Sequence, residues 1–378
     1  GTNEKELKND KILLSSSENR ASSCSDILIY GFSSPKGDLS EAKLFLEYHL
    51  QCNGPISKVR HMPHSPRIIA AQGLDSNGTR IFQLSSTNRC GAGGSAVKRS
   101  RSKSKEEDGL IGCLADEDNS GPSLAWNPNY EGELLTSGAN GALRLWDVPK
   151  EKFNTLEPLA KFVGHDGDVT DVAWSAFEAH CFLSCGEDGK FCMWDKRRAL
   201  EPGIKGGLPT GERINSISWN QKDTNIFATS GADGIVSVWD KRNTDKCLHE
   251  LKWHRNEVRE VVWAPFSKDV LMSAGVDSRV AVWDISKSNL EQSEEEEAEG
   301  PASLLFVHGG HTCPVEAIGW SSDKKWLNAS ISKDGMLQIW RMSAALNDPQ
   351  YIPKLKKQVK RALNSNKSKQ NEKKAKKE

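Results

Sequence analysis

The sequence predicts an all-β fold, a seven-bladed β-propeller, in which small sheets are arranged around a central axis. Three observations predict it: a Trp-Asp dipeptide that recurs at nearly even intervals, a tight turn at a fixed distance before each dipeptide, and a further strand ahead of each turn. Self-similarity at a period of roughly 40–45 residues is typical of four-stranded propeller blades. We therefore expect function on a surface of the ring, and not in a catalytic cleft.

The dipeptide ends four segments of the chain, and Trp340-Arg341 ends a fifth, altered copy. The four are Trp146-Asp147, Trp194-Asp195, Trp239-Asp240 and Trp283-Asp284. Six residues before each Trp stands Asp or Asn, usually followed by Gly, as in Asp188-Gly189. Such pairs accept the positive φ angles of a two-residue hairpin turn. The pattern is that of a WD-repeat β-propeller.

Six copies of the repeat can be placed along the chain. They are Gly54–Leu84, Gly121–Val148, Gly164–Arg198, Gly211–Asn243, His254–Ser286 and Gly310–Met342. Upstream, Lys11–Ser15 and Asp26–Phe32 are expected to form a strand pair, the remains of a further blade, which brings the count to seven. The recurring Trp, His and Asp residues are expected to hold the blades together through buried hydrogen bonds. They therefore specify the fold and not a chemistry.

Insertions and tails divide the chain further. We expect an N-terminal remnant over 1–10, the propeller over 11–342, and a C-terminal helix with a basic tail over 343–378. Within the propeller, residues 87–120 have a charged, patternless composition that predicts a disordered insertion. Residues 288–300 are rich in glutamate and predict an acidic loop. The absence of Met before Gly1 is expected of an expression remnant or a truncation.

Charge is distributed unevenly although the formal net charge is zero. Lysine is concentrated after Tyr351, so the ring itself carries an acidic surplus. An acidic surface favours basic partners and disfavours nucleic acid, whose phosphates attract cations. No direct sequence-specific binding of nucleic acid is expected. No segment has the length of a membrane span or the core of a signal peptide. The basic clusters Lys98–Lys105 and Lys354–Lys377 favour a nuclear location.

Cysteine usage indicates a reducing compartment, because the nine cysteines form no Cys-x-x-Cys pair and no disulfide framework. Cys181, Cys185 and Cys192 lie close in sequence, with His180 nearby, but small buried strand residues are the expected role. No metal or cofactor is predicted. The sequence also lacks a nucleophile turn with a Ser-His-Asp order and a phosphate-binding glycine loop, so we expect no enzymatic activity.

One segment goes beyond the generic repeat: Trp283-Asp284-Ile285-Ser286-Lys287, a glutamate run, Gly300-Pro301, and Leu304-Leu305-Phe306-Val307-His308-Gly309-Gly310-His311-Thr312. This segment resembles the retinoblastoma-binding histone chaperone family, the WD-repeat subunits of chromatin assembly, deacetylase, remodelling and Polycomb complexes. Arg60, Met62-Pro63 and Trp126-Asn127-Pro128 agree with the same family. The similarity is weak from about Lys11 and strong from Gly121 to Met342.

The resemblance implies a histone site on the side of the ring, where the family binds the first helix of histone four. Glu296 and Glu299 match two acidic family residues that hold a histone arginine, and Gly300 and Pro301 follow in register. Phe306, Val307 and Leu346 match the apolar lining. The chemistry is suitable, because a carboxylate pair receives a guanidinium and an apolar groove accepts one face of an amphipathic helix.

The resemblance also implies a second site, at the mouth of the channel, for basic tails such as that of histone three. Asn215 and Glu257 match family residues there, and Asp166 and Asp168 are expected to add acidity. Charged family positions are occupied by uncharged residues, namely Pro55, Ser120, Thr170 and Pro314. Arg259 replaces an aromatic residue.

The predicted function is therefore a non-enzymatic histone-binding scaffold or chaperone subunit of chromatin assembly or chromatin-modifying complexes. The partners implied are core histones and the other subunits of such complexes, with no membrane. The alternative is a generic WD-repeat adaptor, for example in ribosome biogenesis. The acidic loop followed by Leu-Leu-Phe-x-His-Gly-Gly-His favours histones.

Overall fold

A computed structural model describes residues 11–16, 24–33, 43–74, 78–85, 90, 109–114, 121–198, 202–294 and 300–342. The chain divides into a unit of residues 1–339 and a second unit of residues 340–378, of which only 340–342 are described. The expected remnant over 1–10 and the expected helix and basic tail over 343–378 lie outside the described residues.

The strands form seven sheets. The first sheet contains β1 (Lys11–Ser16), β2 (Cys24–Ser33) and β3 (Lys43–Asn53). The second contains β4 (Ile56–His61), β5 (Ile68–Gly73), β6 (Thr79–Gln83), β7 (Leu110–Leu114) and β11 (Thr155–Leu156). The third contains β8 (Leu124–Trp126), β9 (Glu133–Ser137), β10 (Ala142–Asp147) and β12 (Ala160–Val163). The next two contain β13 (Val169–Trp174), β14 (Cys181–Gly186), β15 (Lys190–Asp195) and β16 (Ile204–Gly207); then β17 (Ile214–Trp219), β18 (Ile226–Gly231), β19 (Ile235–Asp240) and β20 (His249–Lys252). The last two contain β21 (Val258–Trp263), β22 (Val270–Gly275), β23 (Val280–Asp284) and β24 (Leu304–His308); then β25 (Val315–Trp320), β26 (Leu327–Ser332) and β27 (Leu337–Arg341).

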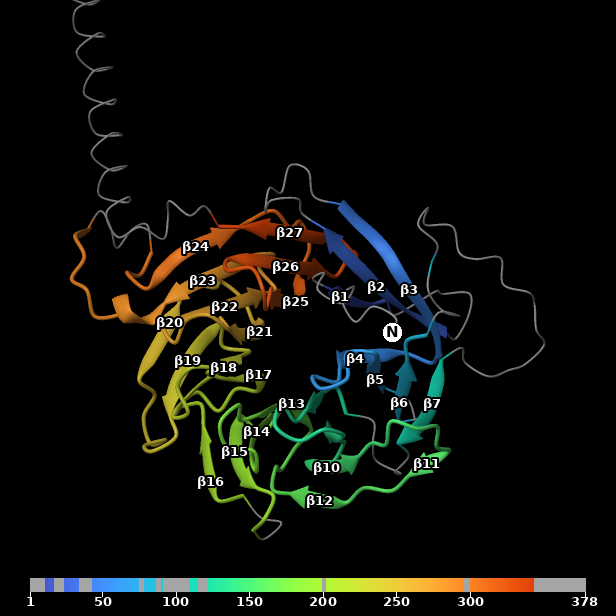
Figure 1. Cartoon of the computed structure of the whole chain (residues 1–378). Helices are drawn as coiled ribbons and strands as arrows, with labels where there is room; N and C mark the ends of the chain where they lie inside the picture. Colours follow the sequence, from blue (N-terminus) through green and yellow to red (C-terminus); the bar gives the residue numbers. More distant parts are fainter. Residues whose placement is uncertain are drawn as a thin grey trace, which may run out of the picture. The chain divides into compact units, whose positions relative to one another are not determined.

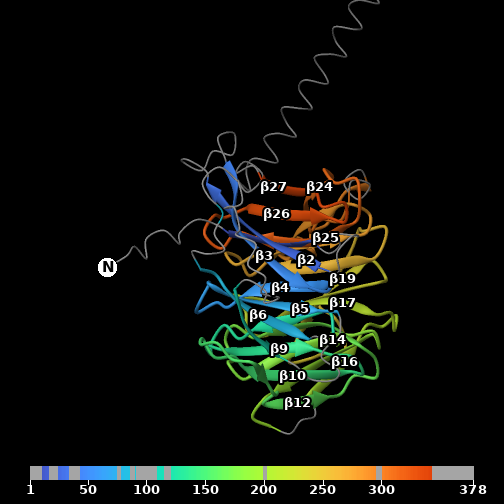
Figure 2. The ribbon, with the colours of Figure 1, turned by 90° about the vertical axis from the view of Figure 1, so that its right-hand side faces the viewer.

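Within the first unit, the sheets follow one another around a central channel, with β4, β13, β17, β21 and β25 nearest the middle (Figure 1). In the view turned by 90°, the strands run across the thickness of the ring (Figure 2). The all-β propeller architecture that the repeat predicts is confirmed.

The predicted number of seven blades is corrected to six. Six sheets, those that start with β4, β8, β13, β17, β21 and β25, follow the order of the repeat. The sheet β1–β2–β3 is different, because β2 pairs along its 10 residues with β3, a strand of 11 residues, and contains no Trp-Asp turn. The two strands expected upstream exist, but Lys43–Asn53 adds a third one that the repeat pattern does not contain.

A second correction concerns residues 87–120. Leu110–Leu114 form β7, which pairs with β6 as the fourth strand of its blade. The prediction of a patternless insertion is wrong for this segment, because its short apolar alternation is hidden between charged stretches. Ile111 and Leu114 are buried, so tertiary packing on the neighbouring strands explains the strand.

The predicted hydrogen-bonded role of the repeated residues is confirmed. In one blade, Ser184 bonds both to His165 (Nε2 to Oγ, 2.7 Å) and to Trp194 (Nε1 to Oγ, 2.9 Å), and Asp188 lies 3.1 Å from His165 Nδ1. His254, Asp277, Ser273 and Trp283 repeat this arrangement. Burial lowers the pKa of His165 more than Asp188 raises it, so the imidazole is neutral at pH 7. These groups stabilise the blades.

Aromatic side chains fill the space between successive sheets. Trp146, Trp194, Trp239 and Trp283 are almost fully buried. The rings of Phe182 and Trp194 stack at 5.9 Å between centroids, and Phe227 and Trp239 repeat the stack at 6.4 Å. Burial of apolar area of this kind contributes about 25 cal/mol per Å². The core is therefore divided into clusters between blades, as the repeat requires.

Candidate functional site

The two ends of the acidic segment are joined by a hydrogen bond, which we call the closed base of the loop. Gln292 Nε2 donates to the Gly300 carbonyl oxygen at 3.0 Å, so the two ends of the segment between them are tied together. Gly300 has φ +134°, and a Cβ there would come within 2.9 Å of Leu304 and close to the Trp253 ring. Pro301 then accepts a hydrogen bond from the Leu304 amide, which starts β24. Glu296 and Glu299 lie outside the described residues.

The strand that follows the loop is the outer strand of its blade. Phe306 pairs with Val282 and Val307 pairs with Ala281 across β23 and β24. All five residues of β24 are half-buried, so apolar side chains on this strand remain accessible. Leu346, the third apolar residue that the resemblance implies, lies outside the described residues. The structure thus places Gly300, Pro301, Phe306 and Val307 on one continuous segment of one blade.

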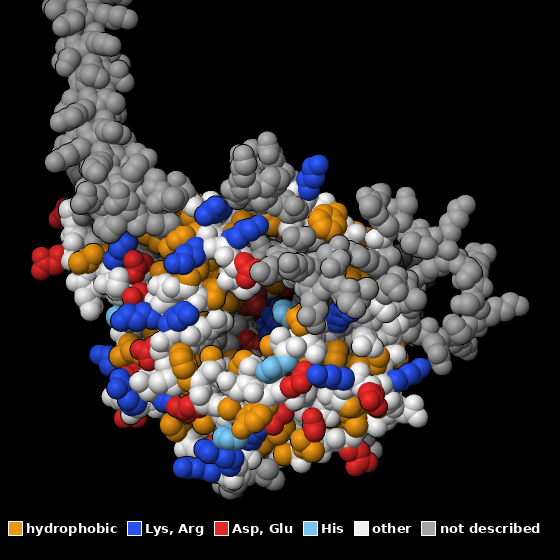
Figure 3. Space-filling view, viewed as in Figure 1, with side chains coloured by type: hydrophobic (Ala, Val, Ile, Leu, Met, Phe, Trp, Pro, Cys, Tyr) orange, Lys and Arg blue, Asp and Glu red, His pale blue; other side chains and the backbone are white. Residues whose placement is uncertain are grey.

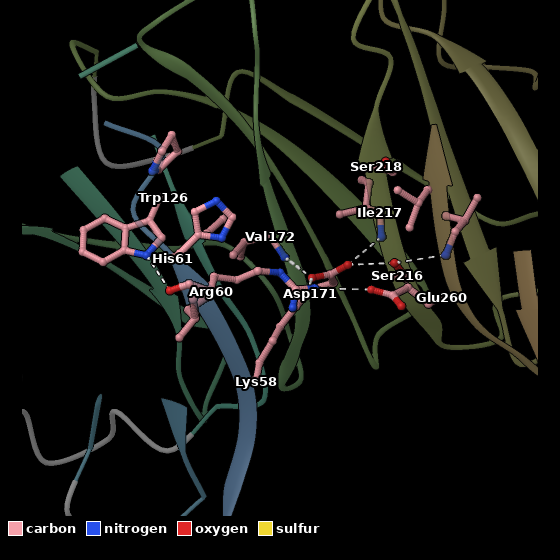
Figure 4. A pocket seen from close by; sticks show the side chains of 15 residues that line it. Lys58, Arg60, His61, Trp126, Asp171, Val172, Ser216, Ile217, Ser218 and Glu260 are labelled. Atoms are coloured by element: carbon pink, nitrogen blue, oxygen red, sulfur yellow. Dashed lines mark hydrogen bonds and ion pairs between the residues drawn. The ribbon is translucent and has the colours of Figure 1, made fainter. Parts of the chain in front are cut away.

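The centre of the ring contains a polar network that joins inner strands of several blades. Asp171 of β13 lies 2.7 Å from Lys58 Nζ of β4, and Ser123 Oγ donates to the same carboxylate at 2.7 Å. On the other side, Ser216 Oγ of β17 donates to Asp171 Oδ2 at 2.8 Å, and the Ile217 amide adds a bond of 3.1 Å. Figure 4 shows Asp171 between Lys58 on one side and Ser216 and Ile217 on the other. The carboxylate is buried and saturated with partners.

A second pair crosses the channel. Arg60 of β4 approaches Glu260 of β21, with 3.4 Å between Nη2 and Oε1, and the Ile318 amide donates to Glu260 Oε2 at 2.7 Å. A cavity of about 280 Å³ lies beside these residues and is lined by Lys58, Asp171, Trp126 and Ser216 as well. Figure 3 shows one face of the ring, on which charges of both signs are interspersed and gather in the central hollow.

The two central carboxyl groups have opposite pKa shifts. Burial would raise the pKa of Asp171, but the charge and hydrogen bond of Lys58, with the bond from Ser123, outweigh it and lower that pKa below 3.8. Burial raises the pKa of Glu260 above 4.5, and the nearby Arg60 and Lys58 only partly oppose this shift. Asp171 is therefore a strongly held anion, whereas ionised Glu260 is less favourable.

The residues predicted for the tail site lie on inner strands or on the turns before them. Glu257, just before β21, is ion-paired with Arg213, and Arg259 Nη1 lies 3.6 Å from the same Oε1 atom. Asn215 donates from Nδ2 to the Val258 carbonyl oxygen at 2.8 Å. The structure brings Glu257 and Asn215 together, but the carboxylate is already paired with two arginines.

The two aspartates expected to add acidity are also engaged. Asp166 is 2.5 Å from Lys190 Nζ, and this pair is exposed. Asp168 Oδ1 accepts a hydrogen bond of 2.9 Å from the Asn140 amide of the preceding blade. These contacts connect neighbouring loops, and they reduce the acidity available to a ligand.

Cys181, Cys185 and Cys192 lie on β14 and β15, as the strand pattern predicts. Burial raises the pKa of Cys181 and of Cys192 to about 12 and that of Cys185 well above its usual value, so the thiols stay protonated. Within the described part of the chain, no group of three His, Cys, Asp or Glu residues is arranged to hold a metal ion. No helix found there has the length and hydropathy to cross a bilayer.

Sequence reasoning missed the central network. The residues of this network occupy polar positions near the start of inner strands; they are Lys58, Ser123, Asp171, Ser216 and Glu260. The signal was present, because charged residues at matching positions of buried strands require partners. The repeat spacing does not give the distances across the channel, so it does not show which of these residues are partners.

Comparison with protein families identifies the repeat. Four stretches, residues 156–195, 207–240, 245–284 and 302–341, match the family described as WD domain, G-beta repeat. They correspond to the blades built on β13 to β15, β17 to β19, β21 to β23 and β25 to β27. The chain thus carries four recognisable WD40 repeats in an all-β propeller. Such propellers are typically scaffolds for protein partners.

Proposed function

We propose that this WD-repeat propeller is a non-enzymatic histone-binding scaffold of chromatin assembly or chromatin-modifying complexes in the nucleus. Its site for a core-histone helix is the acidic side loop, with Glu296 and Glu299 as the arginine clamp. The observation that carries the proposal is the closed base of this loop, where Gln292 is bonded to Gly300. Joining the two ends of a loop reduces the conformational entropy that the loop loses when it binds a ligand.

The segment after the loop supports an amphipathic helix as the ligand. Phe306 and Val307 are half-buried on the outer strand, a short distance in sequence after Gly300 and Pro301. An arginine at one edge of a histone helix would meet the carboxylates, and the apolar face of the helix would lie against this strand. The proposal is limited to the side loop, because Glu257 at the channel mouth is paired with arginines.

Charge reversal of the clamp tests the proposal. We expect Glu296→Lys with Glu299→Lys to weaken binding of a helical histone-four peptide by at least about 2–5 kcal/mol, because the arginine would be buried and repelled. If the two carboxylates were exposed in the complex, each substitution would weaken binding by only about 0.2–1 kcal/mol. Calorimetry measures the affinity, and circular dichroism checks that the variant is folded.

A matched control uses the same loop. Glu291→Lys with Glu294→Lys introduces the same charge change at exposed residues of the loop base and should reduce affinity only slightly. Equal losses in both variants would mean attraction by bulk charge, and unchanged affinity in the Glu296 and Glu299 variant would reject the clamp. Mass spectrometry of proteins captured from nuclear extract separates chromatin complexes from the alternative, ribosome-assembly factors.

A further inference from the structure

One residue near the start of most inner strands lies outside the regular pairing register. Three such residues on successive blades are Thr170 in β13, Asn215 in β17 and Arg259 in β21, and β4 and β25 have the same irregularity. A β-bulge of this kind turns a side chain away from the ladder. In the first two cases, the side chain bonds to the first residue of the next inner strand: Thr170 Oγ1 to the Ile214 carbonyl oxygen at 2.5 Å, and Asn215 Nδ2 to that of Val258 at 2.8 Å.

Arg259 interrupts this series. Its Nε atom is buried and has no hydrogen-bond partner among the described residues, while its Nη1 lies 3.6 Å from Glu257. The distance is too long for a good hydrogen bond. Most buried polar groups in proteins are paired, so an orphaned guanidinium nitrogen requires an explanation. About 39 % of the Arg259 side chain is exposed, so a ligand can reach the guanidinium.

The surrounding charges favour an anion. Arg213 and Arg259 share one carboxylate, that of Glu257, and both contact the same oxygen atom. Arg213 is also about 40 % exposed, whereas Glu257 is 20 % exposed. Because two guanidinium groups share one carboxylate, Arg213, Arg259 and Glu257 together have a net positive charge. A guanidinium presents its N–H groups in a fork that fits a carboxylate or phosphate.

We propose that the channel mouth between β17 and β21 binds an oxyanion, the carboxylate or phosphate of a partner protein segment, through Arg259 and Arg213. Glu257 acts as the internal competitor that the ligand must displace. This site has the opposite charge preference to the acidic side loop. The scaffold would therefore hold a basic partner on its side and an acidic or phosphorylated partner at its channel, and neither site depends on the other.

Peptide binding tests the site directly. The probes are three fluorescent Gly-Ser peptides of equal length that carry glutamate, phosphoserine or lysine at the same positions. Fluorescence anisotropy with the full chain should show binding of the glutamate peptide, the phosphoserine peptide or both, and no binding of the lysine peptide. Whichever of the two anionic peptides binds more tightly identifies the source of the oxyanion.

Substitutions give changes of opposite sign. Arg259→Gln should weaken anionic peptide binding by about tenfold or more, because a charge-assisted bond is lost. Glu257→Gln should strengthen it by about tenfold, because both arginines are released. Arg242→Gln is the control, since Arg242 is a more exposed arginine that pairs with Asp240 elsewhere. It should leave affinity unchanged.

Several results would overturn the proposal. One is lysine-peptide binding that Glu257→Gln weakens, because the mouth would then be a cation site. Absence of anionic peptide binding, or binding that Arg259→Gln leaves intact, would also reject it. If Arg259→Gln does not fold, Arg259→Lys keeps the charge and removes the fork, and it must still lower affinity. Histone-helix binding, measured in the same variants, should not change, so failure of one site is distinguishable from failure of the other.

Discussion

Arg60 of β4 lies 3.4 Å from Glu260 of β21, and the pair joins two blades that are not neighbours in the ring. Glu260 also accepts a bond from Ile318 of β25, so one side chain is connected to three blades. Propeller blades pack mainly on their neighbours, and a contact across the channel is an addition to that packing. With Lys58 and Asp171, it makes the channel a structural element of the ring (Figure 4).

The first prediction concerns Asp171. Replacement by Asn leaves the Lys58 ammonium without its counter-ion, and loss of one partner of a buried pair costs about 3–5 kcal/mol. We expect the free energy of unfolding, measured with urea, to fall by this amount. Asp166→Asn, which breaks the exposed pair with Lys190, should leave the urea midpoint nearly unchanged. Equal effects of the two substitutions would mean that the network contributes little.

The second prediction concerns pH and Glu260. Because the folded-state pKa is raised above 4.5, the neutral form stabilises the fold below that pH, and this contribution is lost as pH rises through the folded pKa. Glu260→Gln should therefore become more stable relative to the parent as pH increases from 4 to 7. Asp171, with its lowered pKa, has the opposite sign and loses stability only as pH falls below 3.8. Urea unfolding at several pH values measures both, and a constant difference between parent and Glu260→Gln would contradict the assignment.

The third prediction compares two hydroxyl groups. Ser184→Ala leaves both His165 Nε2 and Trp194 Nε1 without their partner, whereas Thr229→Val removes the partner of Trp239 only. Each buried polar group left unpaired costs about 1–3 kcal/mol. We expect Ser184→Ala to lower the thermal midpoint roughly twice as much as Thr229→Val. The reverse order would show that these bonds do not determine blade stability.

The fourth prediction tests the base of the acidic loop. Gln292→Ala removes the bond to Gly300. Without this bond, binding of the histone helix has a larger conformational-entropy cost. We expect the affinity for the helical histone-four peptide to fall about three- to tenfold, with the urea midpoint unchanged. Ser286→Ala, which removes an exposed turn bond to Asp284 in the same blade, is the control. Calorimetry that finds equal affinity for both variants would contradict a role for the closed base.

Local sequence patterns determine the blades from β8 onward. The Asp-Gly turns, the Trp at the end of each third strand and the residue alternation are short-range features, so they specify hairpins wherever they occur. For the same reason the acidic loop and the Leu-Leu-Phe-x-His-Gly-Gly-His segment after it can be recognised in the chain. The sequence could not indicate β3 or β7, because neither strand has the repeat signature and both form by pairing with strands already in place.

Only the tertiary structure decides how charges on different blades are combined. Lys58 and Asp171 are 113 positions apart, and Arg60 and Glu260 are 200 positions apart. No periodicity relates them, and ring closure alone brings them within reach. The same holds for Glu257, an acidic residue by sequence whose carboxylate is shared by Arg213 and Arg259 in the folded protein. Electrostatic character depends on distance through space, and a residue's type determines only the charge that it contributes.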